Sequence, residues 1–124
     1  MIKSMLIAGA GGFVGTCLRY LVGVFAKQLF HGVFPLGTFV VNAVGCLIIG
    51  LVFGLSEKTG LLSNSHVLLL ATGFCGGFTT FSAFANEALL LGAKGYWMAN
   101  GLYVLASILV GIFCVWLGRA VICS

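Results

Sequence analysis

Long apolar runs separated by short polar segments dominate the chain. The runs cover residues 4–26, 36–56, 67–91 and 96–118, and each holds at least 20 residues. At a rise of about 1.5 Å per residue, a helix of that length crosses a hydrocarbon core of about 30 Å. Backbone N–H and C=O groups find no water in lipid, so a spanning run has to be helical. The pattern therefore predicts an all-α membrane protein with a single domain over residues 1–124 and four transmembrane helices.

The composition agrees with this picture and removes other classes of protein. The chain is 61% hydrophobic and only 6% charged, whereas a soluble domain carries about 25% charged residues. Its six cations are spread singly along the sequence, which leaves no basic patch for nucleic-acid phosphates. We exclude a soluble enzyme, a nucleic-acid-binding protein and a disordered chain.

The reactive side chains suggest no catalytic or metal centre. The five cysteines form an odd set without metal-ligand spacing, and most of them sit in apolar runs, which favours packing over a disulfide framework. Glu57 and Glu87 both flank spans, whereas a proton-coupled pump needs an ionisable group deep in the membrane. We therefore expect no enzymatic activity.

The charges flanking the runs are almost balanced between the two sides of the membrane. Four spans place Lys3, Lys58 and Arg119 on one side, and Lys27 and Lys94 on the other. Three cations against two give almost no positive-inside bias. Such a chain can insert in both orientations and pair head to tail; the alternative is that one cation dominates and fixes a single orientation.

The third run contains an unusual segment, TGFCGGFTTFS at residues 72–82. Gly-Gly followed by Thr-Thr is poor helix material, and non-helical backbone at membrane depth is tolerated only inside protein or along a cavity. Carbonyls freed by a break can coordinate a cation, and freed amides can face an anion. We predict a break in the third helix; the alternative is a continuous helix whose hydroxyls bond back to the preceding turn.

Glycines spaced four apart occur in the first three runs, and this spacing lets helices approach closely. The glycine-rich segment at residues 9–15 is not a dinucleotide-binding motif, because it lies within a span and no acidic residue follows about twenty positions on. The predicted packing glycines are Gly11 and Gly15, Gly50 and Gly54, and Gly73 and Gly77.

An amide and an aromatic stripe are candidates for an ion pathway. Asn42 lies in the uncharged second run, where it needs a partner on a neighbouring helix or serves a pathway together with the hydroxyls of the third run. Phe74, Phe78, Phe81 and Phe84 follow helical spacing, which usually indicates packing. Ring edges carry positive potential, however, so rings beside amide and hydroxyl donors can hold a small anion without a fixed charge.

Three further polar residues lie within the runs. Arg19 is placed where a cation costs about 2.5–3.5 kcal/mol at mid-bilayer, and it either snorkels to the interface or attracts anions into a vestibule. Tyr103 and Ser107 lie one helical turn apart in the fourth run. They either line a polar track or bond to a neighbouring helix.

Three segments together resemble the CrcB/Fluc fluoride channels. They are GGFVGTCLRY at residues 11–20, PLGTFVVNAVG at 35–45 and GFCGGFTTFSAF at 73–84. The resemblance covers three of the four runs by motif and the whole chain by length, and the third segment is the most specific. It implies an antiparallel dual-topology homodimer in the inner (plasma) membrane, whose two pathways conduct fluoride passively and lower cytoplasmic fluoride. The implied partners are the fluoride ion, a second copy of the chain and the lipid bilayer.

The same resemblance implies roles for individual residues. Asn42 would donate a hydrogen bond to fluoride, and Phe81 and Phe84 would present ring edges to it. Ser82 and Tyr103 would lie along or near the pathway.

The remaining implied roles lie at its ends and at the dimer centre. Ser107 would continue the polar track, and Arg19 would sit near the vestibule. Backbone carbonyls of Gly76 and Thr79 from both subunits would hold a structural sodium ion at the dimer centre.

Two positions depart from the family pattern, and two other functions stay open. Ala83 stands where threonine is frequent, and Gly111 stands one turn past Ser107 where serine is expected, which leaves the lower polar track undefined. A small dual-topology proton-coupled multidrug transporter has a similar size, but it calls for an acidic residue in the first helix, and residues 4–26 contain none. A non-transporting subunit of a membrane assembly is the third interpretation.

Overall fold

The computed structural model describes residues 1–123, and every regular element in that range is a helix. The elements are α1 (Ile2–Leu29), α2 (Leu36–Thr59), α3 (Asn64–Val67), the π-helix η1 (Leu68–Cys75), α4 (Gly76–Phe78), α5 (Phe81–Ala93) and α6 (Trp97–Cys123). Elements α3 to α5 follow one another along the third span. The all-helical prediction is confirmed, and four segments are long and apolar enough to cross a membrane: Ile2–Leu29, Leu36–Thr59, Asn64–Ala93 and Trp97–Cys123.

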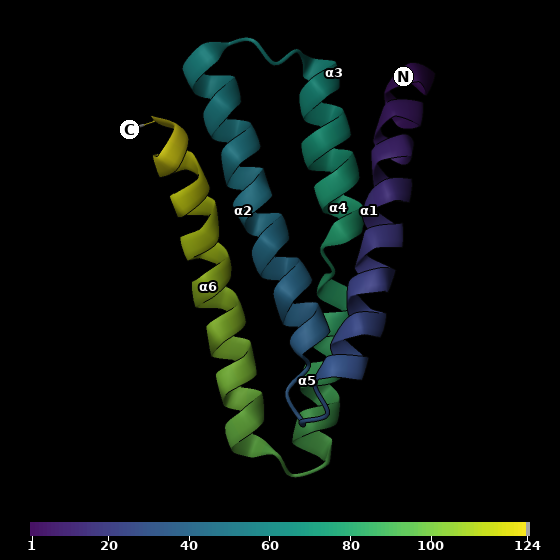
Figure 1. Cartoon of the computed structure of the whole chain (residues 1–124), viewed down its shortest axis with the longest axis vertical. Coiled ribbons are helices and arrows are strands. Elements are labelled where there is room, and N and C mark those ends of the chain that lie inside the picture. The colour runs from purple at the N-terminus through teal and green to yellow at the C-terminus, as the bar shows by residue number, and fades with distance from the viewer. Residues whose placement is uncertain (124) are drawn as a thin grey trace.

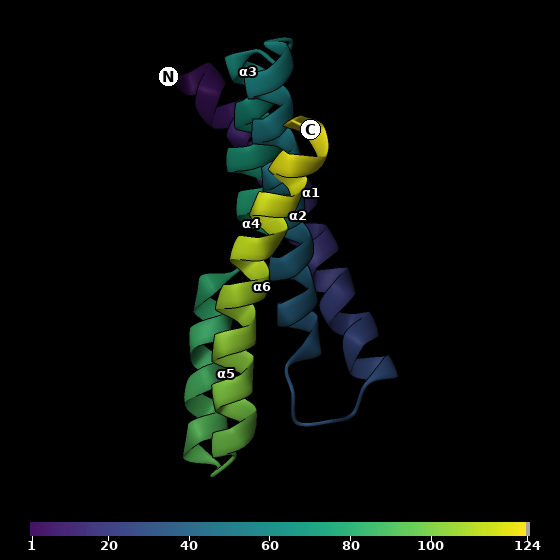
Figure 2. The same cartoon turned by 90° about the vertical axis from the view of Figure 1, so that its left-hand side faces the viewer.

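The helices form two closely packed pairs. α2 packs along α6, and α1 packs along η1 and α4, while α5 lies beside α6 at the opposite end (Figure 1). Figure 2 shows α5 and α6 side by side in the lower half, separated from the C-terminal end of α1. The N-terminus and the C-terminal end of α6 lie at the same end of the molecule as the connection between α2 and α3.

Glycines allow this close approach, as the sequence spacing predicts. A Cβ atom on Gly77 would lie 2.5 Å from the carbonyl oxygen of Gly12, so α4 and α1 touch through their backbones. The α2–α6 contact uses Gly50 together with Gly118 on α6, where a Cβ atom would lie 2.5 Å from the carbonyl oxygen of Leu47. Gly118 has no glycine four positions away, so the four-residue spacing does not reveal it.

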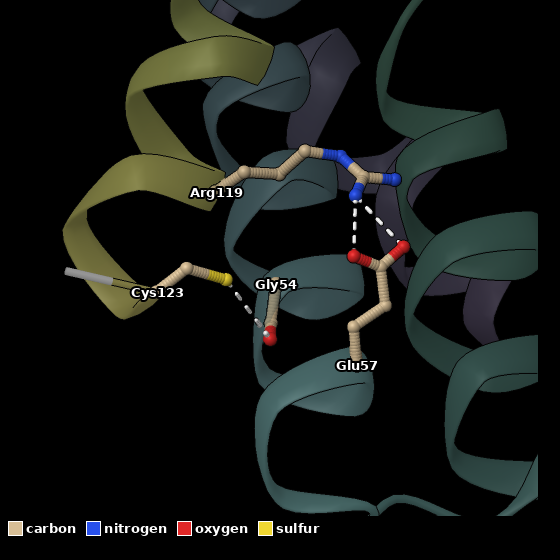
Figure 3. A network of polar contacts seen from close by, with 4 residues as sticks. All are labelled: Gly54, Glu57, Arg119 and Cys123. Carbon is tan, nitrogen blue, oxygen red and sulfur yellow. Dashed lines mark hydrogen bonds and ion pairs between the residues drawn. The ribbon is translucent and has the colours of Figure 1, made fainter.

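Polar contacts tie the C-terminal ends of α2 and α6 together (Figure 3). Arg119 donates two hydrogen bonds of 2.8 Å to the Glu57 carboxylate, and the Cys123 thiol points to the carbonyl oxygen of Gly54 at 3.8 Å. Lys58 Nζ also donates to the carbonyl oxygen of Ile122 at 2.7 Å. These bonds satisfy charges and carbonyls at the end of the bundle, where membrane helices meet the headgroup region.

The buried core is small. Val41, Cys75 and Tyr103 are its fully buried side chains, and many large apolar side chains on all four spans face outward. All five cysteines are free thiols. Outward-facing apolar surface of this extent is typical of helices that contact lipid or a second chain.

Candidate functional site

The third span is interrupted at Thr79 and Thr80, which have extended backbone between α4 and α5. The Thr79 hydroxyl donates to the carbonyl oxygen of Cys75 at 2.8 Å and closes the preceding turn, as the continuous-helix alternative anticipates for such hydroxyls. The Thr80 hydroxyl accepts a 3.2 Å hydrogen bond from the Ala83 amide and caps α5. The two threonines therefore end one helix and begin the next.

Asn42 on α2 binds the interrupted backbone at two points. Its Nδ2 donates to the carbonyl oxygen of Thr80 at 3.0 Å, and its Oδ1 accepts from the Thr80 amide at 2.7 Å. This pairing fixes the orientation of the side-chain amide, because the Thr80 N–H requires an acceptor. One Nδ2 hydrogen remains for another acceptor. The sequence predicted either a partner on a neighbouring helix or a pathway role beside the hydroxyls of the third run, and the contact with Thr80 supplies a partner on that neighbouring span.

Arg19 on α1 also binds this segment. Its Nε donates to the carbonyl oxygen of Gly77 at 3.0 Å. In a continuous helix this oxygen would accept a hydrogen bond from the Phe81 amide. Arg19 lines a groove of about 270 Å³ together with Lys27, Thr38 and Thr80. The cation is thus held beside the interruption, with two basic side chains on one groove wall.

A second groove, of about 280 Å³, opens between α2, the interruption, α5 and α6. Four of the six predicted pathway residues line it: Asn42, Phe81, Phe84 and Ser107. The rest of its lining is Cys46, Ile49, Thr79, Thr80 and Ile108. We call this space the Asn42 groove. Its lining carries amide, hydroxyl and thiol groups on mostly apolar walls and no charged side chain. Thr80 borders both this groove and the groove that Arg19 lines.

The two rings of the Asn42 groove lie close together. The centroids of Phe81 and Phe84 are 5.8 Å apart, and the Phe81 side chain is 78% exposed in the single chain. Phe74 and Phe78, the other members of the predicted stripe, stack on each other at 5.6 Å on the preceding segment and do not line the groove. The interruption splits the stripe into two unconnected pairs.

The other two predicted pathway residues lie outside the groove lining. Ser82 Oγ is 3.4 Å from Thr80 Oγ1 on the exposed side. Tyr103 is fully buried, with its ring 5.2 Å from that of Phe84, and its hydroxyl donates to Glu87 at 3.3 Å. Tyr103 therefore supports the Phe84 ring from behind.

Sequence reasoning missed Cys46 as a groove residue, because a cysteine in an apolar run gives no signal beyond packing. It also did not predict that the Ser107 hydroxyl is buried without a hydrogen-bond partner within residues 1–123. A buried hydroxyl at the wall of a groove is one of the few polar groups there that is free to bind a ligand.

The carbonyls of Gly76 and Thr79 suit a hard cation. Within residues 1–123 no donor bonds to either oxygen, because the Thr80 amide binds Asn42 instead of Gly76. A Cβ atom on Gly76 would meet nothing within 4 Å, so that face of the chain is open. Carbonyl oxygens are ligands of the kind that hard cations bind.

The fold and the site together define a class: a small multi-pass membrane protein whose third helix is interrupted beside an uncharged polar groove. The family model described as "CrcB-like protein, Camphor Resistance (CrcB)" matches residues 6–119, and the chain belongs to this family.

Relatives from several bacteria align over nearly the full chain. The chain is 46% identical over 115 residues to a protein of Chlorobium phaeobacteroides, and the alignment covers 93% of this chain and 89% of the relative. It is 44% identical over 121 residues to a protein of Rhizobium etli, covering 98% and 96%, and 44% identical over 117 residues to one of Oceanobacillus iheyensis, covering 94% and 89%. Each of these relatives is named fluoride-specific ion channel FluC.

Proposed function

We propose that this chain forms a channel that conducts fluoride passively across the membrane and thereby lowers fluoride in the cytoplasm. The family assignment and the names of the relatives support this function. The observation that carries it is the Asn42 groove. There, the free N–H of Asn42, the unpartnered Ser107 hydroxyl and the rings of Phe81 and Phe84 border one uncharged space.

The chemistry of this groove suits a compact, strongly hydrated anion. A pore has to replace the water around such an ion with donors, without binding it so tightly that it cannot leave. Asn42 and Ser107 supply an amide and a hydroxyl donor, and the ring edges of Phe81 and Phe84 supply positive potential without a full charge. Arg19, in the adjoining groove, raises the local anion concentration and forms the vestibule.

The functional unit in this proposal is an antiparallel, dual-topology homodimer with two pathways. The near-balance of flanking cations supports insertion in both orientations. The 78% exposure of Phe81 supports a second copy that covers this ring and completes the pathway. Ser82, on the exposed side of the interruption, and Tyr103, behind Phe84, lie along or near the ion's path.

A sodium ion completes the proposed dimer. The carbonyls of Gly76 and Thr79, which have no donor within residues 1–123, supply two oxygens from each copy of the antiparallel dimer. When bound, the ion would neutralise backbone dipoles that have no other partner at the interface. We place the protein in the inner (plasma) membrane.

Reconstitution tests the proposal. Purified protein is placed in liposomes loaded with fluoride, and efflux is followed with a fluoride-selective electrode after a counter-ion shunt is added. We expect rapid fluoride loss and no comparable loss of chloride. Phe81→Ile removes a ring from the groove and should reduce efflux, whereas Phe113→Ile, on α6 and outside the groove lining, should not. Equal efflux from both variants would refute the ring-edge role, and no efflux from folded wild-type dimer would refute the channel.

The other two interpretations lack a supporting observation. A proton-coupled multidrug transporter needs an acid in the first helix, and the chain belongs to a different family. A subunit of a larger assembly would bring a second protein through mild-detergent purification, so a homodimer purified alone would exclude it.

A further inference from the structure

Cys46 lies on α2 one helical turn after Asn42, and it lines the same groove. Its sulfur also lies close to Gly111 on α6, since a Cβ atom at that position would be 3.5 Å from Cys46 Sγ. Gly111 has no side chain, so the thiol lies in the space beside α6 where a residue one turn past Ser107 would otherwise project.

The thiol is one of several polar groups on this wall. Within residues 1–123 the Ser107 hydroxyl is buried without a hydrogen-bond partner, and Asn42 keeps one N–H free after binding Thr80. Cys46 adds an S–H, which is a weak donor. These three groups line one groove between α2 and α6, and the thiol lies beside Gly111, which has no side chain of its own.

The other cysteines do not share this position. Cys17 is exposed on α1, Cys75 is fully buried, Cys114 is partly buried on α6, and Cys123 points to the Gly54 carbonyl at the end of the bundle. None of the four lines the Asn42 groove.

We propose that the Cys46 thiol forms part of the wall of the conduction pathway and is a covalent modification site at which a small thiol-reactive compound blocks the channel. This inference rests on the proposed function. A group added to Cys46 would project into the groove of about 280 Å³ that Asn42 and Ser107 also line, and there it obstructs the ion.

The reaction with methyl methanethiosulfonate is a simple exchange at sulfur. The Cys46 thiolate attacks the sulfenyl sulfur of the reagent, and a new S–S bond forms as the bond to the sulfonyl sulfur breaks. Methanesulfinate leaves with the electron pair, and the thiol proton goes to water. The product is a methyl disulfide that dithiothreitol reverses.

The test uses the full-length protein in fluoride-loaded liposomes, and each variant is compared with its own untreated efflux rate. We expect methyl methanethiosulfonate to reduce wild-type efflux by about tenfold or more, because the added group obstructs the groove that the ion crosses in the proposed function, and dithiothreitol to restore it. Cys46→Ser should abolish the response to the reagent. A variant that keeps Cys46 and carries serine at the other four cysteines should still be blocked.

Mass spectrometry of the treated protein separates the outcomes. A methyl disulfide on Cys46 with unchanged efflux would overturn the inference. Complete reaction at Cys17 with none at Cys46 would also overturn it, since the thiol would then not face an open groove. Block that persists in Cys46→Ser would place the site elsewhere. Absence of efflux from untreated wild-type protein would instead overturn the proposed function, and the blocking role with it.

Discussion

Asn42→Ala tests whether the amide holds the interruption of the third span in place. The substitution removes the 3.0 Å and 2.7 Å hydrogen bonds to Thr80 and leaves the Thr80 N–H without a protein partner. The Thr80 C=O is the N-cap carbonyl of α5 and keeps the first hydrogen bond of that helix. A buried polar group left unpaired costs about 1–3 kcal/mol, so the orphaned N–H predicts a loss of about 1–3 kcal/mol in the free energy of unfolding. Water entering the groove would bring the loss toward the lower value. We expect fluoride efflux to be lost as well, because the substitution removes a donor and releases the backbone that positions Phe81.

Thr80→Ala is the matched control, because it keeps the backbone groups that Asn42 binds. It removes only the hydroxyl that caps α5 at the Ala83 amide, a loss of about 1 kcal/mol. Both variants are unfolded in detergent micelles by titration with a denaturing detergent, and efflux is measured on the same preparations. If Asn42→Ala is no less stable than Thr80→Ala, the two-point contact does not hold the interruption and the reasoning fails.

Three further predictions concern helix packing, the ion pair and the cation. Gly118→Ala should lower stability by about 1–3 kcal/mol, because its Cβ would overlap the α2 backbone; Gly101→Ala, with nothing within 4 Å, should not, and equal thermal midpoints would contradict this. Glu57→Gln should change stability by less than about 1 kcal/mol, since the Arg119 and Glu57 side chains are 40% and 59% exposed; a large drop in the midpoint would show that the pair matters more. Protein purified and reconstituted with N-methylglucamine in place of sodium should lose fluoride efflux and regain it when sodium is added; sodium-independent efflux would remove the proposed cation site.

The sequence predicts the spans well because the requirement behind them is local. A run must be apolar and long enough to cross the membrane, and both properties are read directly from consecutive residues. Each helix of the structure extends a few residues beyond its predicted run, since polar residues such as Lys58 and Thr59 continue a helix into the interface. The position of the interruption could also be predicted from the sequence, because Gly-Gly followed by Thr-Thr is unfavourable in a helix.

Contacts between helices were harder to predict from the sequence, since they depend on how the helices are shifted and rotated relative to one another. Glycine spacing indicates a close contact without naming the partner, so Gly118 opposite Gly50 emerges only from the fold. The same holds for Cys46, whose position beside Gly111 follows from the packing of α2 on α6. The π-helix η1 was also not predicted, because its residues Leu68–Cys75 carry no pattern that distinguishes it from an α-helix.

The interruption explains why polar residues occur inside otherwise apolar spans. Breaking a helix at membrane depth frees backbone groups that lipid cannot satisfy. Arg19 takes the Gly77 carbonyl, and Asn42 takes both backbone groups of Thr80. In the part of the chain that the structure describes, the carbonyls of Gly76 and Thr79 have no donor, and the proposed sodium ion would be their electropositive partner. On this argument the residues that stabilise the interruption are the same residues that border the two grooves. A substitution at Asn42 or Arg19 should therefore reduce stability and conduction together, whereas one at Phe81, which makes none of these hydrogen bonds, should reduce conduction alone.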